Sequence, residues 1–311
     1  MYLIEEKSVS HVQRSVPEVL VVGGGKGGVG KTCLAANLAV EVARRGWRVI
    51  ILDADLSCSN VETVLGTRSE KKLDDFFYQR GGKDLTSIVC DTHYDNLKII
   101  PGTTGLLDVA NPKYQQKIAL IRELKTLEAD LIVVDLDAGA HLNTLDFFLM
   151  TETNGVLVIT PEKTSIDNAF KFLRASLFRR VERFYQSPEL ALLLKRIESF
   201  REFVECVRTS NMFAEGSREA VCRELGALAR SMKPKIVVNR ARNAYEAQIA
   251  ANILSKHSRQ YLMIEPENLG HMVFDNRVPE TINSGTPLVV SYPKLKVSQC
   301  IGDVANRLGY F

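Results

Sequence analysis

The chain has no long hydrophobic run and no strong charge of either sign. None of its apolar runs approaches the roughly 20 residues that a bilayer-spanning helix needs, so we expect a soluble protein. The 40 lysines and arginines and the 37 acidic residues leave a net charge of +3. That charge is too small to indicate nucleic-acid or membrane binding by bulk electrostatics. Residues 1–15 mix acidic and basic side chains without a long apolar core and are not expected to be a signal peptide.

The sequence also lacks paired cysteines. No cysteine belongs to a C-x-x-C pair or has a histidine at ligand spacing; the six are Cys33, Cys58, Cys90, Cys206, Cys222 and Cys300. A disulfide framework or a zinc site is therefore not expected. Reduced thiols in a cytosolic protein are the simplest interpretation.

A glycine-rich loop stands out against this ordinary composition. Gly25–Thr32 reads Gly-Lys-Gly-Gly-Val-Gly-Lys-Thr and matches the phosphate-loop pattern G-x-x-x-x-G-K-[ST]. The apolar run Val19–Val22 precedes it as an expected strand, and the alanine-rich stretch Cys33–Ala43 follows as an expected helix. In this setting backbone N–H groups converge on phosphate oxygens, and side chains at the glycines would block the approach. The loop predicts nucleotide binding, but the pattern does not require its second lysine, Lys26.

Short apolar runs alternate with longer helical stretches along the chain. The expected strands are Val19–Val22, Val49–Leu52, Leu97–Ile100, Leu131–Val134, Val156–Thr160 and Lys235–Val238. Such strands, separated by helices, predict an α/β fold with a doubly wound, mostly parallel sheet flanked by helices. Gly270–Phe274 and Leu288–Val290 are expected to add a strand and an extended edge, and Lys294–Leu308 a last helix.

One segment interrupts this rhythm. About seventy residues separate the strands at Val156–Thr160 and Lys235–Val238, far more than one crossover helix needs. After an expected helix at Ile166–Tyr185, the stretches Leu190–Arg208 and Ser217–Ser231 repeat apolar residues at helical spacing. Because the sheet resumes afterwards, we expect a single domain over residues 1–311 with a helical insertion at about 186–232.

Two of the expected strands end in carboxylates. Asp53 and Asp55 close the run that begins at Ile50, and Asp135 closes Leu131–Val134 in the manner of a Walker B strand. Ligands bind at the carboxyl ends of strands in such sheets, where an acid can hold Mg²⁺ directly or through water. Gly139 lies just beyond and could bring its backbone N–H close to a γ-phosphate. The alternative for all three acids is an ordinary helix cap or turn residue.

Taken together, these motifs resemble the MinD/ParA family, SIMIBI-class P-loop ATPases with a deviant Walker A motif. The resemblance covers nearly the whole chain outside 186–232 and rests on Lys26–Thr32, Leu52–Asn60, Thr160-Pro161-Glu162 and Val237–Arg240. Within the family, Asp53–Gly66 and Leu145–Leu149 look most like the flagellar-placement branch, FlhG/FleN.

The resemblance assigns roles around the phosphates. It implies that Lys26 reaches across a face-to-face dimer to the partner's nucleotide, as an arginine finger supplied in trans does, while Lys31 acts in cis. Asp55 would orient the attacking water, so Lys26, Lys31 and Asp55 are the expected catalytic residues. Mg²⁺ would be held by Thr32 and the Walker B acid Asp135, with Asp53 near the metal shell.

The resemblance also implies where the nucleotide base binds. Asn239 matches an adenine-reading asparagine, and the stretch Val273–Asp275 would line the base pocket, although this chain has Val273 near a position where proline is usual. The expected nucleotide-binding residues are Gly25, Gly27, Gly28, Val29, Gly30, Lys31, Thr32, Cys33, Gly139, Asn239, Arg240, Phe274 and Asp275.

Other positions depart from the family pattern. The usual switch sequence, Asp-Thr-Gly/Pro-Ala-Gly, is replaced here by Asp135-Leu136-Asp137-Ala138-Gly139. An extra carboxylate near the phosphates could slow hydrolysis or change its trigger. Residues 1–17 show no Asp-Gln-Ala-x-x-Leu-Arg activation motif of the FlhG type. The C-terminal helix is only mildly amphipathic, which favours packing on the sheet over a membrane anchor.

These features predict an ATPase that uses ATP and Mg²⁺ and dimerises with ATP. Such a switch would bind an unidentified partner or activator and control the placement or number of a flagellum or division site. The alternatives are a ParA-like DNA-segregation ATPase and a nucleotide-dependent binding module with very slow hydrolysis. DNA contact would need a local patch such as Arg179–Arg183, for which a solvated helix face is the other interpretation. The expected location is the cytoplasm, with peripheral contact to the inner membrane face left open.

Overall fold

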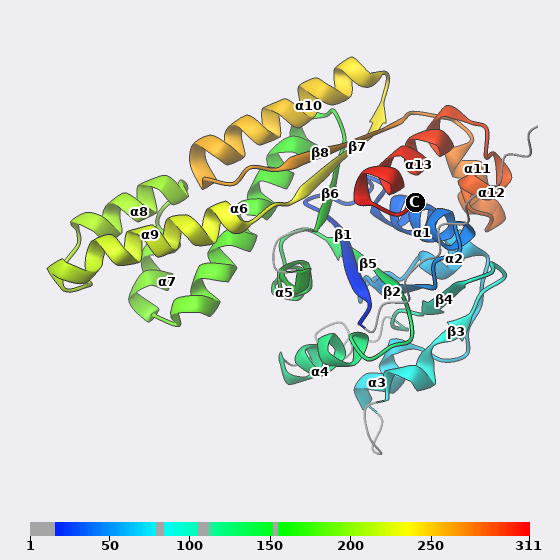
Figure 1. Ribbon diagram of the computed structural model, residues 1–311, viewed down its shortest axis with the longest axis horizontal. Helices are drawn as coiled ribbons and strands as arrows, with labels where there is room; N and C mark the ends of the chain where they lie inside the picture. Colours follow the sequence, from blue (N-terminus) through cyan, green and yellow to red (C-terminus); the bar gives the residue numbers. More distant parts are fainter. Residues whose placement is uncertain (1–15, 79–83, 105–111, 113, 152–154) are drawn as a thin grey trace, which may run out of the picture.

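The computed structural model describes residues 16–78, 84–104, 112, 114–151 and 155–311. Within them, eight strands form one sheet in the order β3-β4-β2-β5-β1-β6-β7-β8 (Figure 1). Only the pairing of β3 with β4 is antiparallel among these strands. The strands are β1 (Glu18–Gly24), β2 (Val49–Ala54), β3 (Cys90–Asp91), β4 (Leu97–Ile100), β5 (Leu131–Ala138), β6 (Val156–Ile159), β7 (Lys235–Ala241) and β8 (Glu267–Val273). The predicted doubly wound, mostly parallel α/β fold is confirmed.

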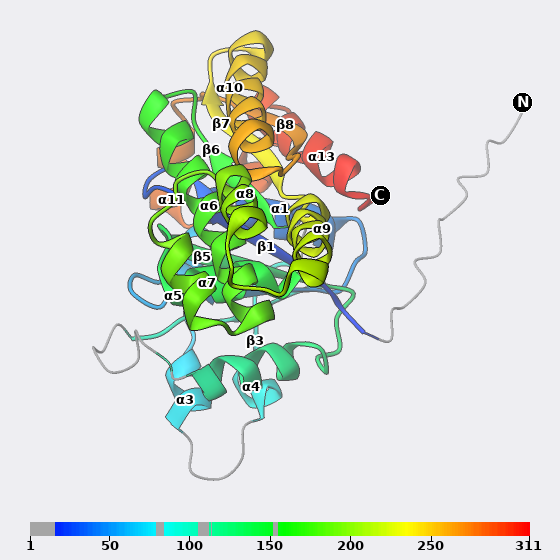
Figure 2. The ribbon, with the colours of Figure 1, turned by 90° about the vertical axis from the view of Figure 1, so that its left-hand side faces the viewer.

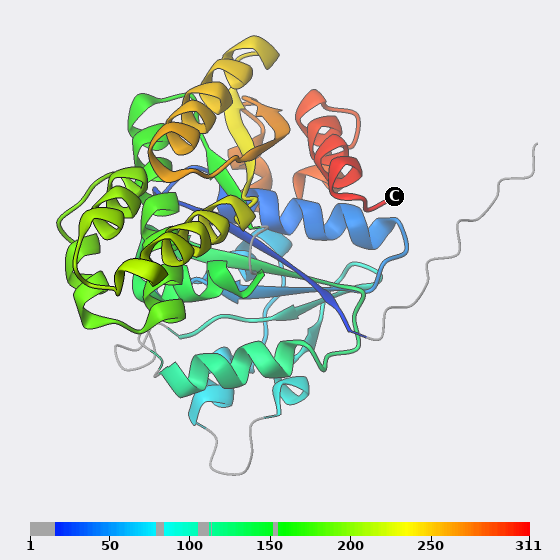
Figure 3. The same ribbon diagram turned by 60° about the vertical axis from the view of Figure 1, so that its left-hand side comes forward.

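Helices cover both faces of the sheet, which is why its central strands are apolar throughout (Figures 1 and 3). Every residue of β2 and β6 is buried. One apolar core forms between the sheet and α1 (Lys31–Arg44), α2 (Val61–Leu65), α12 (Leu288–Ser291) and α13 (Lys296–Leu308). The second forms against α3 (Leu73–Tyr78), α4 (Tyr114–Leu124), α5 (Leu142–Phe148), α6 (Lys163–Tyr185) and α10 (Ala244–His257).

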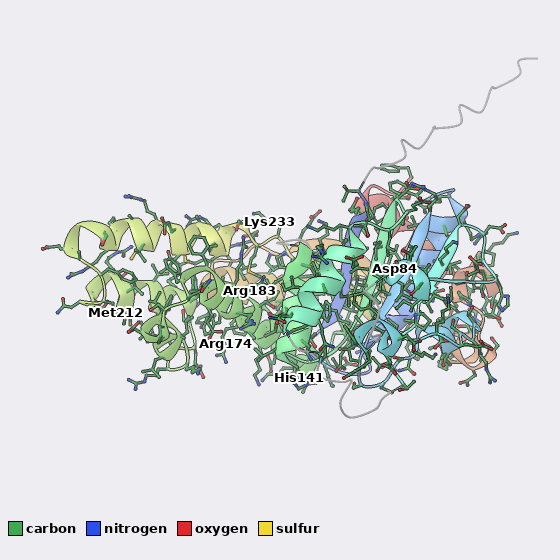
Figure 4. All side chains as sticks on the ribbon, turned by 90° about the horizontal axis from the view of Figure 1, so that it is seen from below. Asp84, His141, Arg174, Arg183, Met212 and Lys233 are labelled. Carbon is green, nitrogen blue, oxygen red and sulfur yellow. The ribbon has the colours of Figure 1, made fainter. Side chains whose placement is uncertain are left out.

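The segment after α6 forms three helices that extend from one end of the sheet (Figures 1 and 2). They are α7 (Pro188–Leu194), α8 (Phe200–Thr209) and α9 (Glu215–Ser231). The stretch 190–208 is therefore two helices, separated at Ser199, whose hydroxyl accepts the Glu202 N–H and caps α8. Apolar residues of all three helices join the core beside α6, and the labelled Met212 lies near the far end of this arm (Figure 4).

The end of the chain packs onto the first helix. The face of α13 that carries Val297, Ile301 and Val304 is buried. Beyond α13, Tyr310 is buried with its ring edge-on to Trp47, at 5.2 Å between centroids, and its hydroxyl donates to Glu18. The helix also packs against β8, so the expectation that it packs on the sheet is confirmed.

Two local predictions differ from the structure. Leu288–Val290 was expected to be an extended edge, but it lies in the short helix α12, where Leu288 and Val289 are buried against α1. This prediction was wrong, because a three-residue apolar run carries no periodicity that separates helix from strand. The two-residue strand β3 was not expected at all.

The remaining elements are short. The helix α11 (Val278–Ser284) precedes α12, and single turns occur at Leu85–Ile88, Leu149–Thr151 and Ser258–Leu262. Among the described residues, no helix combines the length and the apolar character needed to cross a bilayer.

Candidate functional site

The glycine loop lies at the carboxyl edge of the sheet, between β1 and α1. Gly30 has a φ of 95° and is the N-cap of α1, and Gly28 also has a positive φ of 75°. These left-handed conformations favour glycine over residues that carry a Cβ. Lys31, the first residue of α1, is buried beneath the loop. The backbone thus places a lysine and the N–H groups of a helix N-terminus around one point, as phosphate binding requires.

Neighbouring segments press closely on this loop. A Cβ at Gly25 would lie 2.2 Å from the backbone oxygen of Asn168 in α6. A Cβ at Gly30 would lie 2.1 Å from the amide nitrogen of Asn239. Both positions therefore require glycine for packing as well as for access to phosphate.

Asp135 is the most unusual group of the site. It is 1% exposed, and neither carboxylate oxygen has a hydrogen-bond partner among the described residues. Burial raises the pKa of Asp135 well above its ordinary value, and the neighbouring charge of Asp53 adds to that rise. The nearby Thr32 hydroxyl, which does not reach hydrogen-bonding geometry, and the charge of Lys31 lower it in part. A buried carboxylate without a hydrogen-bond partner, in the strand beside the phosphate loop, is suited to receive a cation.

The predicted magnesium site fits these residues. Asp135 supplies a carboxylate, Thr32 a hydroxyl at the start of α1, and Mg²⁺ prefers few protein oxygens together with water and phosphate. Among the described residues, no group of three or more His, Cys, Asp or Glu side chains is arranged as a metal site. Magnesium would therefore depend on these two side chains and on the oxygens of the nucleotide.

Asp53 lies opposite Asp135 in the register of β2 and β5, but its oxygens are occupied. One accepts the N–H of Asp55 at 3.2 Å, and the other accepts those of Asn60 and Val61 at 2.9 and 3.0 Å. Burial nevertheless raises the pKa of Asp53 to about 7, with the charge of Asp55 contributing. In this structure Asp53 holds the loop after β2 and the start of α2. Its place near the metal shell stays a prediction.

Asp55 presents its carboxylate from the same loop in a fixed orientation. One oxygen, Oδ1, accepts the N–H of Ser57 at 3.2 Å, the hydroxyl of Ser57 at 2.8 Å and the N–H of Cys58 at 2.8 Å. The hydroxyl of Ser57 also lies 3.2 Å from Oδ2 of Asp137, at the end of β5. The loop after β2 and the altered switch sequence are therefore in direct contact.

The switch glycine is engaged with the phosphate loop. Gly139 has a φ of 86°, and its N–H donates to the backbone oxygen of Gly24 at 3.2 Å. That N–H would have to leave Gly24 before it could reach a γ-phosphate. Phosphate sensing by Gly139 stays a prediction, and the structure identifies the bond that such sensing would break.

The second loop lysine points outward. The side chain of Lys26 is exposed, and its ammonium donates to the hydroxyl of Thr164 at 3.1 Å, in the first turn of α6. In the described part of the chain, no hydrogen bond or ion pair joins Lys26 to Asp135 or Lys31. An exposed hydrogen bond of this kind costs little to break, which leaves Lys26 able to reach another molecule.

Of the residues expected at the base pocket, Asn239 is bound directly to the phosphate loop. The amide of Asn239 donates to the backbone oxygen of Val29 at 2.8 Å, and its oxygen accepts the N–H of Arg240. Phe274 is 55% exposed, and a hydrogen bond from Arg277 lowers the pKa of Asp275 to about 2. Adenine contacts by these residues stay predictions.

Burial raises the pKa of the Cys33 thiol to about 11, which makes it an unreactive neighbour of the site.

Sequence reasoning missed several partners of these residues. Ser57 and Thr164 were not singled out, although a serine two positions after an aspartate is a common turn signal. Arg179 was considered only as part of a solvated face or a DNA-binding patch. It instead donates to Asp146, a buried carboxylate that also accepts from Lys117 at 2.6 Å. Although burial opposes it, these hydrogen bonds lower the pKa of Asp146.

Similarity to known proteins agrees with this site. Residues 20–288 match the family model of the CobQ/CobB/MinD/ParA nucleotide-binding domain. The antiactivator FleN of Pseudomonas aeruginosa is 32% identical over 159 residues, which cover 50% of this chain and 55% of FleN. The flagellum site-determining protein YlxH of Helicobacter pylori is 29% identical over 167 residues, 53% of this chain and 55% of YlxH. The chain thus matches only about half the length of these relatives.

A solved structure shares the whole architecture. The septum site-determining protein MinD of Pyrococcus horikoshii, complexed with Mg-ADP, superposes with a TM-score of 0.64 and 20% identity. The superposition covers 94% of this chain and 96% of that protein, which shows the common fold. With the family model matching most of its length and FleN and YlxH among its relatives, the chain belongs to the MinD/ParA family of nucleotide-binding P-loop ATPases, near the FlhG branch.

Proposed function

We propose that this protein is an ATP-hydrolysing switch that dimerises when it binds ATP and Mg²⁺. The observation that carries the proposal is Asp135, a buried carboxylate without a hydrogen-bond partner among the described residues, next to Lys31 and Thr32. Such a group is costly in an empty protein and is compensated when a cation binds. Lys26 supports the dimer, because it is exposed at the loop rather than directed at the site of its own chain.

The residues supply a complete set of roles for hydrolysis. Lys31 and the loop N–H groups hold the phosphates, and Mg²⁺, when bound, neutralises charge on the phosphate oxygens. Asp55 orients a water that attacks the γ-phosphorus, forming one O–P bond as the bond to the ADP oxygen breaks. The products are ADP and phosphate, and the water proton leaves with phosphate or solvent. Lys26 from a second copy would stabilise charge on the transferring group.

The relatives suggest what the switch controls. FleN is named as an antiactivator, YlxH as a flagellum site-determining protein and MinD as a septum site-determining protein. We infer that this chain acts in the cytoplasm on the placement or number of a flagellum or division site, through a partner that recognises the dimer. Residues 186–232, an insertion within one domain spanning 1–311, are the proposed partner surface. They are not needed to hold nucleotide.

A nucleotide-dependent binding module with very slow hydrolysis is the second candidate. It is favoured by Asp137, which adds a carboxylate beside Asp55, and by the bond that ties Gly139 to Gly24. DNA segregation finds less support, because Arg179 is occupied by Asp146 and Arg180 donates to the backbone oxygen of Leu228.

Single-turnover hydrolysis separates the two candidates. The wild-type protein, Lys26→Ala and Asp55→Ala are mixed with labelled ATP and Mg²⁺, and released phosphate is followed. We expect both variants to hydrolyse ATP on the order of a hundredfold more slowly, because each lacks one interaction made in the transition state. If the wild-type protein is no faster than either variant, it is a binding module and not an ATPase.

A further inference from the structure

The hydroxyl of Ser57 lies between two carboxylates that belong to different parts of the fold. It is 2.8 Å from Oδ1 of Asp55, in the loop after β2, and 3.2 Å from Oδ2 of Asp137, at the end of β5. The three residues form what we call the Ser57 clasp. Because Ser57 is exposed, the clasp is not needed to satisfy a buried group.

Both ends of the clasp are anchored to the backbone. Oδ1 of Asp55 also accepts the N–H groups of Ser57 and Cys58. Oδ1 of Asp137 accepts the N–H of Ala138 at 2.5 Å, which fixes that carboxylate at the strand end. All the donors described for Asp55 converge on Oδ1, and none of the described residues donates to Oδ2.

The chemistry of a hydroxyl makes the two contacts competitive. A serine hydroxyl has one proton to donate, and two ionised carboxylates can only accept. When the Ser57 hydroxyl donates its proton to Asp55, the Ser57 oxygen and Oδ2 of Asp137 face each other with no proton between them, and they repel. When the hydroxyl donates to Asp137, Asp55 loses the hydrogen bond from the Ser57 side chain. Hydrogen bonds to charged groups are stronger than those between neutral groups. The acceptor to which Ser57 donates therefore decides how firmly the Asp55 carboxylate is held.

We propose that Ser57 is a positioning residue that holds Asp55 for hydrolysis, and that Asp137 slows hydrolysis by competing for its hydroxyl. The inference rests on the proposed function, since Asp55 must orient the attacking water for its position to matter. The contact between the loop after β2 and the end of β5 would thereby limit the rate of ATP hydrolysis. Any movement of the β5 end toward bound nucleotide would shift the hydroxyl between its two acceptors.

A double-mutant cycle on kcat and KM for ATP tests this restraint. Ser57→Ala is expected to lower kcat about tenfold, by loss of one hydrogen bond to a charged group, with KM little changed. Asp137→Asn is expected to raise kcat about threefold, since an amide can donate to the serine oxygen and leave the hydroxyl proton to Asp55. In the Ser57→Ala background, Asp137→Asn should change nothing.

Two controls keep this result specific. Ser59→Ala removes a hydroxyl of the same loop that bonds the backbone oxygen of Asp55 rather than its carboxylate, and it should leave kcat near the wild-type value. Ser57→Thr restores the hydroxyl and should recover most of the lost rate. Thermal unfolding of each variant confirms that it is folded.

The outcomes distinguish this inference from the proposed function. If Asp137→Asn raises the rate equally in the wild-type and the Ser57→Ala backgrounds, Asp137 acts directly on the charge of the nucleotide and the inference is overturned. Failure of Ser57→Ala to lower kcat would overturn it as well. In both cases an inactive Asp55→Ala would leave the proposed function standing, whereas a wild-type rate equal to that of Asp55→Ala would contradict both.

Discussion

The carboxyl edge of the sheet and the helical insertion differ in whether their buried groups and helix ends have partners. At the edge, Asp135 is buried with no hydrogen-bond partner among the described residues. In the insertion, the side chains of Ser187 and Ser199 cap their helices, and Phe200 and Phe203 lie in the core. An uncompensated buried carboxylate lowers the free energy of unfolding, whereas caps and buried aromatic rings raise it. The difference separates a region with an unpartnered buried carboxylate, suited to bind a ligand, from one whose helix ends are capped and whose rings are packed.

Asp135→Asn should have the largest effect on the rate of ATP hydrolysis, and it tests directly whether the carboxyl edge of the sheet is built to bind a ligand. Loss of the metal-binding carboxylate is expected to slow ATP hydrolysis on the order of a thousandfold. The nucleotide-free protein should unfold at the same or a higher temperature, because the substitution removes a buried charge without leaving a cavity. Single-turnover assays and calorimetry measure the two effects, and a clear loss of thermal stability would mean that Asp135 already has a structural partner.

Phe200→Ala tests the other side of the comparison. Phe200 is fully buried in the insertion, so its removal should lower the free energy of unfolding by about 3–5 kcal/mol. The hydrolysis rate of the folded fraction should stay within about twofold of wild type, since the ring lies away from the nucleotide. Urea unfolding with Leu192→Ala as the exposed control, expected within about 0.5 kcal/mol, makes the measurement. A large fall in rate would connect the insertion to the site.

A smaller effect is expected in the pH dependence of the free energy of unfolding, through Asp53 at the carboxyl edge of the sheet. Because burial raises the pKa of Asp53 to about 7, the folded protein keeps a proton that the unfolded chain releases near its ordinary value. The folded state then binds more protons, so the stability of the nucleotide-free protein should fall as pH rises from about 4 to about 7. Denaturant unfolding across this range should show the decline, and Asp53→Asn should make it shallower while the part that comes from Asp135 remains. Stability that rises with pH in the wild-type protein and is unaltered by Asp53→Asn would contradict the shift.

The sequence was sufficient to predict the fold because its strands are short, apolar and β-branched. Runs such as Val49–Leu52 and Leu131–Val134 became strands that begin at the expected residue but extend further, to Ala54 and Ala138. The two-residue strand β3 has too little pattern to be recognised, and the short helix at Leu288–Ser291 has no periodicity of its own. The start of a new helix at Ser199 within the stretch 190–208 was missed, although Ser199-Phe200-Arg201-Glu202 matches the S-x-x-E capping-box pattern.

The site was predictable only where its chemistry lies in contiguous residues. The loop at Gly25–Thr32 can be recognised because its glycines directly follow an apolar strand. Asp135 can be recognised because it directly follows the apolar run Leu131–Val134. The contacts Lys26 to Thr164 and Ser57 to Asp137 join residues 138 and 80 positions apart, so only the folded sheet brings them together. The same holds for Arg179, whose partner Asp146 lies on a different helix.

The central claim is that two chains share one active site through Lys26, and subunit mixing tests it most directly. Lys26→Ala and Asp55→Ala are each expected to be inactive in single-turnover hydrolysis. In a mixed dimer, the site of the Lys26→Ala chain keeps its own Asp55 and receives Lys26 from the other chain. With equal amounts and random pairing, about a quarter of the wild-type activity should return when ATP is added. A mixture no more active than its separate components would contradict a lysine supplied in trans.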